Sequence, residues 1–407
     1  MKILVLNVGS STIKYQLFNM EDETVLSKGL LERIGTDVSV LKHEKTGKDV
    51  IRLNQQISDH RHGIGLILKM LVDSDYGPIQ DLNEIDAVGH RVVHGGEQFS
   101  KSIIIDDEVK KAISECCELA PLHNPPNLIG IEECQSQLSN INHVAVFDTA
   151  FHQSIKPVNY LYALPMELYT KYKIRRYGFH GTSHDFVSHK AAEILGKPYE
   201  KCKIISIHLG NGASIAAIRN GQVVDTSMGL TPLEGLVMGT RCGDIDPAII
   251  YLLMDKLNMD PKQANDYFNL KSGMLGLTGF SSDLRDILNA AASGNQVAKL
   301  AIDIYCVRVK GYIGKYMAEL NGCDCIVFTA GVGENATEIR RIICENMDYM
   351  GIKIDHDKNQ VSGKQADISS HDSRVKVLVI PTNEELIIAR ETFTQVKKQP
   401  QRVLPHV

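Results

Sequence analysis

The strongest constraint on the fold is a strand pattern at the start of the chain. An apolar run over residues 2–6 leads into the turn "GSS" at 9–11, and an alternating segment over 13–18 and another near residue 25 follow. Alternation of apolar and polar residues between turns predicts strands, here a meander of three. The same succession of strand, glycine turn, strand, turn and strand occurs again near the middle of the chain.

The second copy begins at residue 203, where "KIISIHL" enters the turn "GNG" at 210–212. Strands over 214–218 and 223–226 follow, and Asn220-Gly221 between them is the strongest short signal for a two-residue hairpin. We therefore predict a duplicated fold.

Buried strands and helical segments alternate after each meander. The strands are "INHVAVFD", "CIVFTAG" and "VKVLVIPTNEE", which end at residues 148, 331 and 385. This alternation predicts an α/β fold with a mixed sheet in each half. A length of 407 residues suggests two large lobes, and we expect residues 399–407 to form a loose tail.

Composition narrows the class of protein. The net charge of -5 offers no basic field for nucleic acid, and 43% hydrophobic with 23% charged residues is typical of a globular chain. We find no apolar run that could cross a bilayer, and residues 2–6 are too few for a signal segment. The nine cysteines include no C-x-x-C pair, which favours reduced thiols. We expect a cytoplasmic protein that binds small molecules.

The two glycine turns are suited to phosphate. Turns without bulky side chains let backbone N–H groups converge on an anion, and Ser10, Ser11 and Thr12 add hydroxyl donors. Lys14 follows Ile13 on an alternating strand and so points to the opposite face, which we take as the cleft side. Alone, such a turn is more often a tight hairpin, but its duplication favours phosphate binding.

Two motifs of the first half contain candidate substrate-binding residues. "GHRVVHGGE" places Arg91 among glycines, where its planar guanidinium can hold a carboxylate or a phosphate, although a surface salt bridge explains it equally well. Its histidines, His90 and His94, favour structural roles. "LHNPPNL" offers His123 as an active-site donor, although a capped connector also explains this segment.

Two motifs of the second half display catalytic side chains. "RRYGFHGTSH" presents His180 beside a glycine, and "MGTRCGDIDP" leaves Arg241 sterically open. Phosphoryl transfer develops negative charge that positioned cations and hydrogen-bond donors stabilise. Two arginines, a histidine and an aspartate therefore predict phosphoryl-transfer chemistry.

Carboxylates follow two buried strands. Asp148 ends one of them, where its carboxylate can face a cleft, although it could instead cap the next helix. Glu384 in "IPTNEE" follows another. Mg²⁺ prefers oxygen ligands, so Glu384 together with Asn7 or Asp148 is the candidate metal site.

One motif favours a different class of enzyme. "FTAGVGENA" fits G-x-G-x-x-A, and Asp355 lies near the offset of an NAD-binding acidic residue. The alternative is that Gly331 and Gly333 let the backbone approach a nucleoside at a helix start. The sequence G-x-x-x-x-G-K-[ST] is absent, which excludes a P-loop kinase.

Together the motifs resemble the acetokinase family of the sugar kinase, hsp70 and actin superfamily. The matching segments run from Asn7 to Leu386 and include "NVGSSTIK", "GHRVVHGGE", "RYGFHGTSH", "HLGNGAS", "MGTRCGDIDPA" and "PTNEEL". The resemblance implies duplicated ribonuclease-H-like mixed-sheet domains with the nucleotide in the interdomain cleft. It places an N-terminal lobe at 1–150 plus 386–407 and a nucleotide-binding lobe at 151–385.

The resemblance also implies an activity. It indicates direct in-line transfer of a phosphoryl group from ATP to acetate, giving ADP and acetyl phosphate, with Mg²⁺ or in its place Mn²⁺, by a cytoplasmic homodimer. Arg91 and Arg241 would hold the carboxylate and the phosphoryl group, and His180 would stabilise the equatorial charge. Asp148 would orient or activate acetate, and His123 would add a donor.

Further roles follow from the same resemblance. Asn7 and Glu384 would position the metal. The nucleotide would contact Lys14, His208, Gly210, Asn211, Gly212, Asp283, Leu284, Arg285, Gly331, Val332, Gly333, Glu334 and Asn335.

Val93 affects which carboxylic acid the substrate pocket can accept. Relatives that act on propionate tend to have a smaller residue there, so a valine narrows the pocket and favours acetate over propionate. A propionate or short-chain fatty acid kinase is the alternative. A nucleotide-switched structural or chaperone protein on the same fold is another, and it would not need Arg91, His180 and Arg241.

Overall fold

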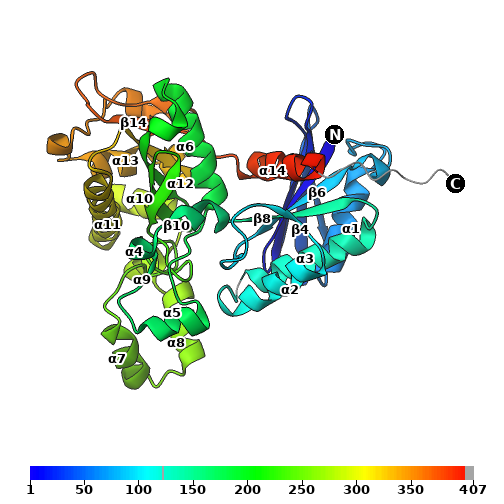
Figure 1. Cartoon of the computed structure of the whole chain (residues 1–407), viewed down its shortest axis with the longest axis horizontal. Helices are drawn as coiled ribbons and strands as arrows, with labels where there is room; N and C mark the ends of the chain where they lie inside the picture. Colours follow the sequence, from blue (N-terminus) through cyan, green and yellow to red (C-terminus); the bar gives the residue numbers. More distant parts are fainter. Residues whose placement is uncertain (122, 399–407) are drawn as a thin grey trace. The chain divides into compact units, whose positions relative to one another are not determined.

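The computed structural model describes residues 1–121 and 123–398, so the predicted tail at 399–407 lies outside the described residues. Internal contacts divide the chain into two compact units. Unit 1 comprises Met1–Ala150 and the segment that begins at Asn383, and unit 2 comprises Phe151–Thr382. Each unit has one mixed sheet with helices packed on it (Figure 1).

The sheet of unit 1 has the strand order β5-β4-β3-β2-β1-β6-β8-β7. Strands β1 to β5 form an antiparallel meander, β1, β6 and β8 are parallel, and β7 is antiparallel to β8. The bounds are β1 Lys2–Val8, β2 Thr12–Asn19, β3 Thr24–Glu32, β4 Ser39–Lys45, β5 Ile51–Gln55, β6 Ala87–Val92, β7 Ile103–Ile104 and β8 Asn142–Phe147.

Alternation along β1 builds two cores in unit 1. Leu4 and Leu6 pack with residues of α1 (His60–Leu71), whereas Ile3 and Val5 pack with residues of α14 (Glu384–Lys398). Successive side chains of a strand point to opposite faces, which explains this division. Helices α2 (Asp107–Glu115) and α3 (Asn124–Gln137) complete the unit, and α3 packs beside α1.

The sheet of unit 2 repeats this plan. Its order is β11-β10-β9-β12-β14-β13, with β9, β10 and β11 as an antiparallel meander and β9, β12 and β14 parallel. The bounds are β9 Lys203–Leu209, β10 Ala213–Arg219, β11 Gln222–Thr226, β12 Cys325–Thr329, β13 Ala366–Asp367 and β14 Lys376–Val379. The predicted duplication is therefore confirmed.

The second meander has the predicted hairpin. Arg219 of β10 pairs with Gln222 of β11, and the two turn residues Asn220 and Gly221 have φ of 56° and 75°. Positive φ at both central positions is what a type I′ turn requires, and asparagine and glycine tolerate it.

Helices cover the sheet of unit 2. Val187 and Ala191 of α6 pack on Ile204 of β9 and Ala216 of β10, and α11 packs against β9, β10 and β11. The helices are α4 Pro157–Tyr160, α5 Met166–Tyr172, α6 Gly181–Leu195, α7 Ala248–Leu257, α8 Pro261–Leu270, α9 Gly273–Thr278, α10 Leu284–Ala292, α11 Gln296–Leu320, α12 Ala330–Asn335 and α13 Thr337–Cys344. Within 1–121 and 123–398, no helix is both long enough and apolar enough to span a bilayer.

Candidate active site

Three parallel strands of unit 1 bring polar residues to one end of the sheet. Asn7 lies on β1, Arg91 lies on β6, and Asp148 directly follows β8. Parallel neighbours end at the same edge of a sheet, so these side chains meet although they are far apart in the sequence. Glu384 joins them from the first residue of α14.

Arg91 is the centre of this cluster. Its Nε and Nη2 donate to the two carboxylate oxygens of Asp148 at 3.0 and 2.6 Å, and its Nη1 donates to Asn7 Oδ1 at 3.3 Å. Glu384 Oε2 lies 4.0 Å from Arg91 Nε. Burial alone lowers the pKa of Arg91, but the carboxylates of Asp148, Glu384 and Glu385 raise it by more, so the guanidinium stays charged.

The loop after β6 is held by the first turn of α3. The backbone N–H of Val93 donates to Asn127 Oδ1 at 3.0 Å, and Asn127 Nδ2 donates to the carbonyl of Val8. Asn124 exchanges hydrogen bonds with both backbone groups of His94. The motif "HNPPN" therefore fixes the position of buried Val93. The two asparagines were not predicted as site residues. The signal that could have indicated them is their spacing of three residues in the first turn of a helix.

Unit 1 also contains the predicted site residues His123 and Lys14. His123 directly precedes α3 and is half-buried. Lys14 on β2 is exposed, as its alternation with buried Ile13 predicts, and its Nζ lies 2.5 Å from Glu385 Oε1.

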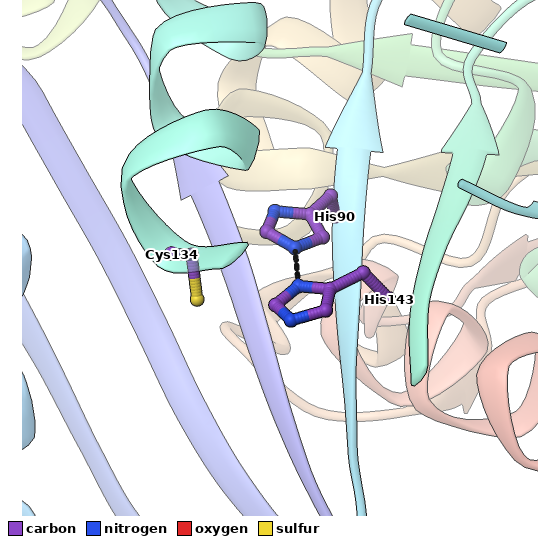
Figure 2. Close-up of side chains that lie close together, drawn as sticks. All are labelled: His90, Cys134 and His143. Carbon is purple, nitrogen blue, oxygen red and sulfur yellow. Dashed lines mark hydrogen bonds between the residues drawn. The ribbon is translucent and has the colours of Figure 1, made fainter. Parts of the chain in front are cut away.

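A second group of possible metal ligands lies in the core of unit 1. His90, Cys134 and His143 lie close together (Figure 2) and are all buried, and His90 Nε2 lies 2.9 Å from His143 Nδ1. His143 Nε2 lies 3.0 Å from the carbonyl of Leu138, which can only accept, so His143 Nδ1 accepts from His90. Burial lowers the pKa of both rings, and burial raises the pKa of the Cys134 thiol to about 12. We interpret the group as a neutral hydrogen-bonded pair beside a protonated thiol, which agrees with the structural role expected of His90.

Unit 2 brings His180 and Arg241 to one glycine turn. Gly212 lies between β9 and β10, and a β-carbon there would lie 3.3 Å from His180 Nε2 and 3.6 Å from Arg241 Nη1. His180 adopts φ 56°, a left-handed conformation that is rare outside glycine and common at functional sites. The turn and both side chains therefore surround one small space.

The environment of Arg241 differs from that of Arg91. Its Nη1 donates to the carbonyl of Pro232 at 3.1 Å and to Met238 Sδ at 3.7 Å, and no carboxylate in the described part of the chain pairs with it. Burial therefore lowers its pKa without an opposing charge. A half-buried guanidinium with neutral partners is suited to bind an anion.

His208 supports this turn from β9. It is buried, its ring stacks on that of His180 with centroids 4.1 Å apart, and its Nδ1 lies 2.8 Å from Ser183 Oγ.

A cavity of about 670 Å³ opens beside the turn, within unit 2. This volume lies in the usual range for small-ligand sites. Eight predicted nucleotide-binding residues line it: Gly210, Asn211, Asp283, Leu284, Arg285, Gly331, Val332 and Asn335. The lining also includes six residues that were not predicted to bind the nucleotide, namely Gly239, Met274, Ser282, Leu288, Tyr305 and Ala336. Among the predicted residues, His208, Gly212, Gly333 and Glu334 do not line it, and Lys14 belongs to unit 1.

The glycine-rich segment after β12 is anchored by two hydrogen bonds. Glu334 Oε1 accepts from the backbone N–H of Thr382 at 3.1 Å, and the fully buried Arg340 donates to the carbonyl of Gly333 at 2.8 Å. The segment forms the short helix α12 at the carboxyl end of β12. Gly333 and Glu334 therefore hold the shape of the cavity wall that Gly331, Val332 and Asn335 line.

Comparison with known proteins identifies the family. The Acetokinase family matches residues 2–390. The acetate kinase of Syntrophomonas wolfei is 62% identical over 397 residues, which cover 98% of this chain and 100% of that protein. The crystal structure of Porphyromonas gingivalis acetate kinase has a TM-score of 0.92 at 47% identity and covers 97% of this chain and 99% of its own. A propionate kinase from Francisella tularensis has a TM-score of 0.90 at 43% identity, with 97% and 99% covered.

The chain belongs to the acetokinase family. The predicted family and fold are confirmed, and acetate kinase activity with ATP or ADP is the function that the family and these relatives support. This result replaces the hypotheses of an NAD enzyme and of a nucleotide-switched chaperone.

Proposed function

We propose that this chain catalyses reversible phosphoryl transfer between ATP and acetate by direct in-line displacement, giving ADP and acetyl phosphate. An acetate oxygen would form a bond to the γ-phosphorus as the bond to the ADP oxygen breaks. The observation that carries the proposal is the placement of Arg241 beside His180 at the Gly212 turn, since within residues 1–121 and 123–398 no carboxylate pairs with this cation. Such groups stabilise charge on a transferring phosphoryl group without reorganising.

The nucleotide would occupy the cavity of unit 2. Apolar Leu284, Leu288 and Val332 line it and suit the flat faces of a base, and Gly210 and Asn211 belong to the turn that precedes β10. We therefore assign unit 2 as the nucleotide-binding lobe.

Acetate would bind in unit 1 at Arg91. The Nη1 group of Arg91 donates to the neutral amide of Asn7 at 3.3 Å, a long contact that a carboxylate can replace. Asp148 holds the other side of the guanidinium and orients it. Buried Val93, fixed by Asn127, would face the methyl group. His123 would add a donor near the transferring group.

Mg²⁺ fits the donor set of unit 1. The Asn7 amide oxygen and the Glu384 carboxylate both lie within 4.0 Å of the Arg91 guanidinium, so oxygen donors gather at one place. Hard cations such as Mg²⁺, or Mn²⁺ in its place, prefer such donors. Asn7 and Glu384 would hold the ion, which would offset the charge of the nucleotide phosphates.

A homodimer is proposed from one helix of unit 2. α7 reads "AIIYLLMDKL", and none of its residues is buried. Tyr251, Leu252 and Leu257 are 75%, 54% and 50% exposed. A contiguous apolar face of this kind marks a protein interface, and a second copy of the chain is the occupant that we propose.

We place the enzyme in the cytoplasm. All nine cysteines are free thiols, which is typical of a reducing compartment, and ATP is available there.

Acyl phosphate trapped as hydroxamate tests the proposal. The assay supplies Mg-ATP with acetate or propionate to the full chain and to Arg241→Ala. We expect acetate to react faster than propionate, by about tenfold because one methylene is worth ~1–3 kcal/mol in an apolar pocket, and we expect the variant to be inactive. Faster reaction with propionate would assign the chain to the specificity of the Francisella relative. No acyl phosphate from either acid would refute the proposed function.

A further inference from the structure

Unit 2 holds a chain of buried hydroxyl and imidazole groups that the proposed mechanism does not use. It lies between α6 and the β9–β10 hairpin. Ser214 of β10 pairs with His208 of β9, and Ser206 lies two residues before His208, so the three side chains share one face of the sheet. His184 reaches this face from the first turn of α6, and like the two serines it is fully buried.

Ser214 lies between two imidazole rings. Its Oγ is 2.9 Å from His180 Nδ1 and 2.7 Å from His184 Nε2. At the far end, His184 Nδ1 is 2.8 Å from Ser206 Oγ. These contacts join Ser206, His184, Ser214 and His180 into one continuous line of hydrogen bonds that ends at the Gly212 turn.

The number of hydrogens restricts how these groups are arranged. A serine hydroxyl has one hydrogen, so Ser214 can donate to only one of the two rings, and the other ring must donate to it. Burial, His152 and His208 lower the pKa of His184 well below its usual range, so His184 is neutral and carries one ring hydrogen.

Two arrangements fit these three hydrogen bonds. In the first, His184 Nε2 donates to Ser214, Ser214 donates to His180 Nδ1, and neutral His180 carries its hydrogen on Nε2. In the second, all the bonds reverse, and His180 Nδ1 donates to Ser214. A neutral His180 would then present a bare Nε2, a poor partner for an anion held by Arg241 at the Gly212 turn.

We propose that Ser214 and His184 are positioning residues that fix the tautomer of His180, so that its Nε2–H points to the Gly212 turn. The consequence for catalysis depends on the proposed function, because the donated hydrogen would stabilise the phosphoryl group. The Ser214 hydroxyl can also turn toward His184 when His180 is doubly protonated. The line of hydrogen bonds therefore serves both states in which Nε2 is a donor.

Nuclear magnetic resonance of the ¹⁵N-histidine-labelled full chain tests the tautomer directly. We expect His180 of the wild type, at alkaline pH and without substrates, to carry its hydrogen on Nε2. In Ser214→Ala we expect a mixture of the two tautomers. A wild-type His180 that carries its hydrogen on Nδ1 would overturn the proposal, and this measurement needs neither a variant nor catalytic activity.

A double-mutant cycle tests the effect on turnover. We expect Ser214→Ala to lower kcat by about tenfold, with less than about a twofold change in the KM for acetate. In a His180→Ala background, the same substitution should lower kcat by less than about a further twofold. A double variant whose loss of kcat equals the product of the two single losses would contradict the coupling. Ser188→Ala is the matched control, because Ser188 on α6 is a buried serine like Ser214 of β10 but contacts Asp185 and Tyr199 instead.

A variant that fails to fold and a failure of the proposed function can each be distinguished from a failure of this proposal. If Ser214→Ala fails to fold, Ser214→Cys keeps a small donor at the same place, and its kcat should lie between those of the wild type and His180→Ala. If the wild type forms no acyl phosphate, the proposed function fails, whereas the tautomer of His180 still supports or refutes the positioning role.

Discussion

Asp148 accepts from Arg91 through both of its carboxylate oxygens, at 3.0 and 2.6 Å, and is only 1% exposed. Removing the arginine takes away the guanidinium that pairs with this buried charge. We expect Arg91→Met to lower the free energy of unfolding by about 3 kcal/mol, measured by urea denaturation. The double variant Arg91→Met/Asp148→Leu removes both charges and should regain most of this loss. A single variant as stable as the wild type would contradict the structural role of the pair.

Close packing between β6 and α14 makes Gly89 a second test of stability. A β-carbon at Gly89 would lie 2.4 Å from Thr392 Oγ1 and 2.8 Å from Ile388 Cγ2. We expect Gly89→Ala to lower the free energy of unfolding by about 1–3 kcal/mol because the core is overpacked. Gly311→Ala in α11 is the control, since its β-carbon meets nothing within 4 Å and alanine favours a helix. Equal effects at the two positions would refute the packing argument.

Buried histidines predict loss of stability in acid. Burial lowers the pKa of His152 from 6.5 to about 4, although its hydrogen bond with the Phe179 carbonyl opposes this shift. Between these two values the unfolded chain binds more protons, so the free energy of unfolding rises with pH in this window. It falls as the pH drops from 6.5 toward 4, by up to about 3 kcal/mol for this ring.

The variant His152→Gln isolates this contribution. Its side-chain amide can still donate to Phe179, but it does not titrate. Urea denaturation at several pH values gives the free energy of unfolding as a function of pH. Between pH 4 and 6.5 this free energy should change less steeply with pH for the variant than for the wild type. Identical slopes would mean that His152 does not contribute to the acid sensitivity.

The exposed face of α7 predicts how the chain associates. Leu252→Glu places a charge in the proposed interface and should convert a dimer into a monomer, as measured by analytical ultracentrifugation. Tyr349→Glu is the control, because Tyr349 is a 77% exposed aromatic residue outside α7. A monomeric wild type, or a variant that remains dimeric, would exclude this interface.

The sequence was sufficient to predict much of the fold. The two meanders follow from alternating residues and from Asn220-Gly221, which are local signals. The sequence also predicted that Asp148 ends a buried strand, and it directly follows β8, at the edge where parallel strands end.

The remaining site residues depend on contacts between distant segments. Asn124 and Asn127 hold the Val93 loop only because α3 packs beside β6, and Ser214 joins His180 to His184 only because α6 covers β10. Tyr305 reaches the cavity from the middle of α11, whose pattern is that of an ordinary buried helix. No local spacing distinguishes such residues from core residues.

The most direct test of the account is the pair of effects expected for Arg241→Met. Because Arg241 is a cation without a carboxylate partner among the described residues, its replacement by an apolar side chain should leave the urea midpoint and the affinity for ADP nearly unchanged. The rate of acetyl phosphate formation should fall by at least about a thousandfold, since the loss occurs in the transition state. Retained activity, or a loss explained by weaker ADP binding, would contradict the assignment of Arg241 to the transferring phosphoryl group.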